Sequence, residues 1–170
     1  LAGEVVADYT YFAALNKKLT KEQIDSNFTK AIRLAIVGQS KASQARVMAR
    51  WAQYFLSVKP PEYVDYASSL VAKAIQTYPV ESSPYAIAGV MMAGEEGKII
   101  VKSAKAKSSK KPPDAVLLLN QSLMLDPSNW TALWAKYDIA SQTGKKKETE
   151  IIAKLLKRYY PRARKVQDLE

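Results

Sequence analysis

The residue types that carry most enzyme chemistry are missing from this chain. None of its 170 residues is histidine or cysteine, so the usual general base, the thiolate nucleophile and the commonest zinc ligands are all absent. The one adjacent acidic pair is Glu95-Glu96, and neighbouring residues on a helix point in different directions, which suits a two-carboxylate site poorly. No glycine-rich phosphate loop or metal-spaced acidic cluster occurs. We therefore expect no enzyme activity, no cofactor and no metal site.

The strongest charged feature is a run of lysines in a chain whose formal net charge is +10. The predicted anion-binding loop contains Lys98, Lys102, Lys105, Lys107, Lys110 and Lys111. Such a run can hold the phosphates of RNA or an anionic membrane surface. However, it has no aromatic residue to stack on bases and no arginine to recognise them. The alternative is a soluble loop whose charge discourages self-association.

The residues from Trp130 to Pro161 predict two short amphipathic helices joined by a turn. Apolar side chains recur at helical spacing in each half, at Trp130, Leu133, Trp134, Tyr137 and Ala140, and then at Ile151, Ile152, Leu155, Leu156 and Tyr159. Gly144 separates the halves, because a residue without Cβ can take the left-handed turn that ends a helix. Two such helices cannot bury their shared face alone, so we expect similar neighbours. Residues 162–170 are more polar and predict a capping extension or a frayed end.

Prolines mark a period in the chain. Pro127 and Pro161 are 34 positions apart, the length of a tetratricopeptide repeat. Pro79 and Pro127 are 48 apart, which is 34 plus 14. The lysine-rich residues 97–113 account for the surplus as an insertion between the two helices of one repeat.

Small and large residues recur in a fixed register before these prolines. The second-helix pattern small-x3-large-x2-small-x4-Pro is Ala67, Val71, Ala74, Pro79; then Ala115, Leu119, Ser122, Pro127; then Thr149, Ala153, Leu156, Pro161. The first-helix pattern appears as Tyr85, Ala88, Gly89 and Met92. The chain thereby resembles the tetratricopeptide repeat (TPR) family, with repeats at about 5–38, 40–81, 82–129 and 130–163. The resemblance implies one all-α domain, a right-handed α-solenoid of about four helix pairs; the alternative is an irregular helical bundle.

The resemblance also implies a partner-binding groove, because the first helices of stacked pairs line the concave side. Carried over by register, the groove residues are Tyr9, Ala13, Asn16, Ala52, Leu56, Ala86, Val90, Trp134 and Asp138. This lining is small and apolar, which suits an amphipathic helix or an extended hydrophobic segment of a partner. It lacks the lysine, arginine and asparagine set with which some family members grip chaperone tails. We therefore expect a non-catalytic scaffold module that binds a protein or peptide.

Two other functions stay open. The opening V-V-A-D-Y-T-Y-F-A-A-L and the start at Leu1 resemble the TPR-type tails of bacterial O-antigen ligase-like glycan polymerases, which implies an extracytoplasmic accessory domain of a larger membrane protein. No apolar run here approaches a membrane span. The third hypothesis is RNA binding through the lysines. The start at Leu1 favours a piece of a longer bacterial protein over a processed product, and its location, cytoplasmic or extracytoplasmic, stays open.

Overall fold

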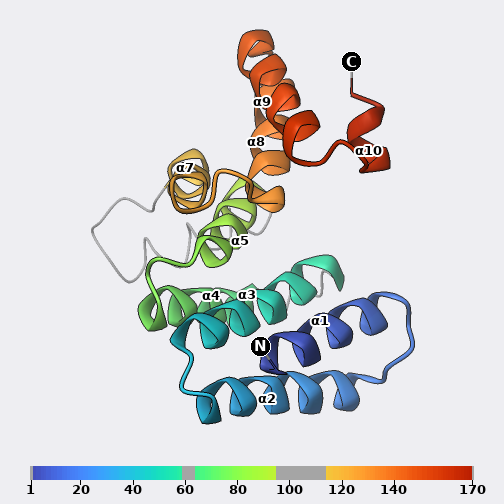
Figure 1. Ribbon diagram of the computed structural model, residues 1–170, viewed down its shortest axis with the longest axis vertical. Coiled ribbons are helices and arrows are strands. Elements are labelled where there is room, and N and C mark those ends of the chain that lie inside the picture. Colours follow the sequence, from blue (N-terminus) through green and yellow to red (C-terminus); the bar gives the residue numbers. More distant parts are fainter. Residues whose placement is uncertain (1, 59–63, 95–113, 170) are drawn as a thin grey trace.

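The computed structural model describes residues 2–58, 64–94 and 114–169, and all regular secondary structure in these ranges is helical (Figure 1). The helices are α1 (Ala2–Leu15), α2 (Lys21–Val37), α3 (Lys41–Val58), α4 (Val64–Thr77), α5 (Ser82–Ala93), α7 (Ala115–Leu125), α8 (Trp130–Gln142), α9 (Lys146–Tyr159) and α10 (Arg164–Gln167). This confirms the predicted all-α fold class. The lysine-rich insertion at 97–113 and Glu95-Glu96 lie outside the described residues.

Local sequence signals explain where several helices begin and end. Thr20 and Gln23 form a capping box at the start of α2, in which each side chain accepts a hydrogen bond from the other's backbone N–H. Asn129 caps α8 by accepting a hydrogen bond from the N–H of Ala132 at 3.0 Å. Gly144 follows α8 with a φ of +69°, the left-handed conformation that glycine adopts without steric cost.

Helices that follow one another in the chain pack as pairs: α1 with α2, α3 with α4, α5 with α7, and α8 with α9. The first helix of each pair also packs against the first helix of the next, so α1, α3, α5 and α8 form a continuous row. The second helix of each pair contacts the following first helix as well. In Figure 1 the N-terminal two pairs lie at one end of the molecule, with α5 and α7 in the middle and α8 to α10 at the other end.

The core is built largely from small residues and rings. The first two pairs share a cluster that includes Phe28 and Trp51, whose rings stack with centroids 5.3 Å apart. Between α5 and α7, Gly89 lets the helices approach so closely that an added Cβ would lie 2.6 Å from Leu119. A further cluster joins Leu133, Trp134, Ile152, Leu156 and Val166.

The C-terminal tail contributes to that last cluster. The sequence predicts that residues 162–170 form a capping extension or a frayed end and are too polar to bury. The structure corrects the last point, because α10 places Val166 in the core, where this residue is 1% exposed. The Nζ of Lys165 lies 4.0 Å from the centroid of the Trp134 ring. The tail therefore covers the final helix pair.

Candidate functional site

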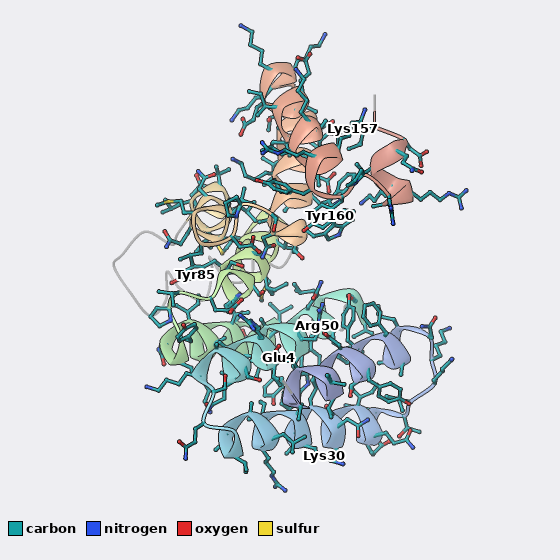
Figure 2. All side chains as sticks on the ribbon, viewed as in Figure 1. Glu4, Lys30, Arg50, Tyr85, Lys157 and Tyr160 are labelled. Atoms are coloured by element: carbon teal, nitrogen blue, oxygen red, sulfur yellow. The ribbon has the colours of Figure 1, made fainter. Side chains whose placement is uncertain are left out.

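A pocket of about 360 Å³ lies along the row of first helices. All four first helices contribute to it. Its lining comprises Glu4, Ala7 and Asp8 of α1; Arg46, Val47, Ala49, Arg50 and Gln53 of α3; Ser83, Ala86 and Ile87 of α5; Trp130 and Thr131 of α8; and Asp126, Asn129 and Tyr160 beside them. Figure 2 shows Glu4 and Arg50 on one side of this opening and Tyr160 on the other. The pocket thus joins parts of the chain that are distant in sequence.

Two ion pairs between α1 and α3 border the pocket. Nε of Arg50 lies 2.7 Å from the Asp8 carboxylate, and Nη1 of Arg46 lies 3.5 Å from that of Glu4. Both pairs are separated by 42 positions in the sequence. Because the residue numbers differ by the same amount in both pairs, α1 and α3 run parallel, with equivalent turns side by side. In antiparallel helices the sum of the two numbers would be constant instead.

The arginines are held in place from several directions. Nε of Arg46 also bonds the carboxylate of Glu81 at 2.8 Å, and only 9% of the Glu81 side chain is exposed. Burial acts to lower the pKa of Arg46, but the charges of Glu81 and Glu4 outweigh it and raise that pKa. Arg50 donates to Gln53 Oε1 at 2.7 Å and lies 5.1 Å from the centroid of the Tyr11 ring. Both guanidinium groups are therefore fixed before any ligand arrives.

The opposite wall is organised around Tyr160. Its ring packs edge-on against Trp130, with centroids 4.8 Å apart, and its hydroxyl donates to the backbone carbonyl of Ser128. Burial raises the pKa of Tyr160, and the charge of Asp126 raises it further. Asn129, which caps α8, donates to the Ser82 hydroxyl at 3.0 Å and so links α8 to α5.

The pocket has mixed rather than one-sided charge. The lining contains two guanidinium groups, from Arg46 and Arg50, and three carboxylates, from Glu4, Asp8 and Asp126. Since the arginines are already paired with carboxylates, the site offers no excess of positive charge to a phosphate. Its hydrogen-bonding groups instead suit a polar ligand that both donates and accepts.

The residues predicted to line an apolar groove lie in several places. Of the nine, only Ala86 borders the pocket. Ala13, Ala52, Ala86 and Trp134 are buried in the packing between helices, and Leu56 and Val90 are half-buried. Tyr9, Asn16 and Asp138 are exposed. The pocket that the structure has is consequently more polar than the groove that was expected.

The reason for this difference is a rotation of the assumed register. On α1 the first predicted residue, Tyr9, lies one position after Asp8, and on α3 Ala52 lies between Arg50 and Gln53. On α5 the register agrees better, since Ala86 itself borders the pocket. One position turns the side chain by about 100° around the helix. On α8, Trp134 follows Trp130 by one turn, but α10 covers it.

The sequence contains a pattern from which the charged pairs beside the pocket could have been predicted. Residues 4–9 read E-V-V-A-D-Y and residues 46–51 read R-V-M-A-R-W. Both have a charged residue, valine, alanine, a second charged residue and an aromatic in the same order, with opposite charges on the two helices. Matching these segments pairs Glu4 with Arg46 and Asp8 with Arg50. The six candidate lysines from Lys98 to Lys111 lie outside the described residues, so their role stays a prediction.

Within residues 2–58, 64–94 and 114–169, no group of three or more acidic residues is arranged to hold a metal ion. None of the helices in this part of the chain has both the length and the apolar character that crossing a bilayer requires. Comparison of the chain with protein-family models, with curated proteins and with solved structures gives no match.

Proposed function

We propose that the chain is a TPR-like binding module in which four stacked helix pairs present the pocket to a segment of a protein partner. The contacts along α1, α3, α5 and α8, together with the contact of each second helix with the next first helix, support a solenoid. The proposed repeats at about 40–81, 82–129 and 130–163 each contain one of these pairs, and the first, at about 5–38, contains all of its pair except the first turn of α1.

The observation that carries this proposal is the pocket lining, to which all four first helices contribute. A surface assembled from consecutive pairs suits an extended segment that crosses them in turn. The fixed arginines, carboxylates and Gln53 supply donors and acceptors for the main chain and polar side chains of such a segment. Trp130 adds an apolar surface at the end of the pocket. The expected ligand is therefore a polar peptide segment with an aromatic or aliphatic anchor, rather than a purely hydrophobic one.

Selection of displayed random peptides on the full chain tests this function. Peptides recovered on the wild-type protein should lose binding to Thr131→Trp, because a bulky ring at this half-buried position fills the pocket. The matched control is Ser69→Trp on the exposed side of α4, which adds the same ring away from the pocket and should leave binding unchanged.

The charged wall can be tested with the same peptides. Arg50→Gln keeps a hydrogen-bond donor but removes the charge that pairs with Asp8, so affinity should fall without complete loss of binding. Equal binding of every selected peptide to wild type and Thr131→Trp would show that the pocket is not the binding surface.

A further inference from the structure

One side of α1 is apolar and faces solvent. Val5, Tyr9 and Phe12 follow one another at spacings of four and three residues, which places them on one face of the helix. They are 68%, 64% and 57% exposed, although the opposite face of α1 is buried against α2 and α3. We call Val5, Tyr9 and Phe12 the α1 outer row. Three large apolar side chains in one exposed row indicate a surface that another element covers.

Helix α3 carries an equivalent row of residues, and the helix that packs on it shows what kind of element can cover the α1 outer row. The ion pairs Glu4–Arg46 and Asp8–Arg50 set the equivalence of α1 and α3 at 42 positions. By this equivalence, the α1 outer row corresponds to Val47, Trp51 and Tyr54 of α3. The spacing and the order of valine, aromatic, aromatic are the same. The two helices thus carry one pattern, which is exposed in α1, whereas in α3 Val47 and Trp51 are buried and Tyr54 is half-buried.

In α3 the two aromatic residues of this pattern pack against the second helix of the preceding pair. Val47 is fully buried and Trp51 is 7% exposed. The Phe28 ring of α2 stacks on Trp51 at 5.3 Å and contacts Tyr54 with centroids 6.2 Å apart. Helix α2 presents its apolar face through Ile24, Phe28, Ala31 and Ala35. Therefore, the surface that fits such a row is an amphipathic helix with a ring at its centre.

We propose that the α1 outer row docks an amphipathic helix of the α2 type, with apolar residues at spacings of four, three and four and a phenylalanine that stacks on Tyr9. The opposite end of the helix row differs, because α10 places Val166 in the core there and Lys165 lies over Trp134. At this end α10 packs against the last second helix, α9, and covers part of it, although Ile151 of α9 stays 60% exposed. This partial cover argues against head-to-tail stacking of a second copy. None of the three residues of the α1 outer row lines the pocket, so a failure of this docking test would leave the function proposed for the pocket unaffected.

A synthetic copy of α2 is the probe that tests this inference. A labelled peptide of residues 20–38, stapled between positions 26 and 30 on the side that α2 exposes, presents the required face as a preformed helix (Lys30 is labelled in Figure 2). Fluorescence anisotropy with the full chain should show saturable binding, with a Kd below about 1 mM. Binding should weaken about tenfold or more for the protein variant Tyr9→Lys with Phe12→Lys, since two buried apolar contacts are lost.

Matched controls separate docking from other effects. The protein variant Ile36→Lys with Val37→Lys removes two exposed apolar residues of α2 outside the row, and it should keep wild-type affinity. A peptide in which Phe28 is replaced by glutamate should not bind. Thermal melting by circular dichroism should give folded proteins for both variants, because the replaced side chains are exposed.

Three results would overturn the inference. The first is the absence of saturable peptide binding to the wild-type chain. The second is unchanged binding to the Tyr9→Lys, Phe12→Lys variant, which would mean that the peptide exchanges with the internal α2. The third is a wild-type dimer in sedimentation velocity that the same variant dissociates, which would assign the row to a second copy of the chain.

Discussion

The rings of Phe28 and Trp51 lie almost parallel, 7° apart in orientation, and this stack joins the second helix of the first pair to the first helix of the second. Trp51 also meets Phe55 and Tyr66, with centroids 6.3 Å and 5.6 Å away, so one indole connects three helices. The junction between the first two pairs therefore depends on aromatic packing.

Trp51→Ala should destabilise the protein by about 3–5 kcal/mol, because it leaves a cavity in this junction. The matched control is Tyr9→Ala at the equivalent position of α1, which is 64% exposed. This change should alter stability by no more than about 0.5 kcal/mol. Urea denaturation followed by circular dichroism measures both, and equal losses would contradict the difference in burial between Trp51 and Tyr9.

Gly89→Ala should destabilise the protein by about 1–2 kcal/mol, since overpacking against Leu119 outweighs the better helix propensity of alanine. The background variant Leu119→Ala removes the atoms that lie 2.6 Å from the added Cβ and leaves the Ala115 carbonyl oxygen at 3.3 Å, so there Gly89→Ala should cost much less. A double-mutant cycle from urea denaturation gives the coupling. The same cost in both backgrounds would show that the two residues do not limit the approach of α5 and α7.

Tyr160 should make the stability fall at alkaline pH. Its folded pKa lies above the ordinary value of 10.0, so the native state holds this proton more tightly than the unfolded state does. The resulting stabilisation is fully present below pH 10 and is lost as the pH rises through the folded pKa. Tyr160→Phe should lower stability by about 1 kcal/mol at pH 8, through loss of the bond to Ser128, yet flatten the decline from pH 10 to 12. Tm measured across this range tests the point, and parallel curves would refute it.

Arg46→Ala should cost about 1–3 kcal/mol, because it leaves the nearly buried carboxylate of Glu81 without its guanidinium partner. Adding Glu81→Gln removes the unpaired charge and should recover part of the loss. Arg33→Ala, on the exposed side of α2, is the matched control and should change little. Urea midpoints at low and high salt are the measurement, and a loss no greater than that of the control would contradict the role of Arg46.

The all-α class and most helix ends could be predicted from local signals, such as the Thr20 capping box and the glycine turn at Gly144. These features depend on a few neighbouring residues. The pocket could not be predicted from the proline period, because prolines fix where second helices end but not how first helices are rotated. That rotation follows from the pairing of Arg46 with Glu4, a contact between distant segments. Burial of Trp134 depends on a four-residue helix whose only buried residue is Val166.

Arg46 has a mechanical consequence for the row of first helices. It lies on α3 and bonds Glu4 of α1 on one side and Glu81, just before α5, on the other. One side chain thus connects three successive helix pairs. Any change in curvature that separates the first pair from the third has to stretch or break a bond to this guanidinium. Arg46 therefore opposes such a change from the wall of the pocket, beside the place that a bound ligand would occupy.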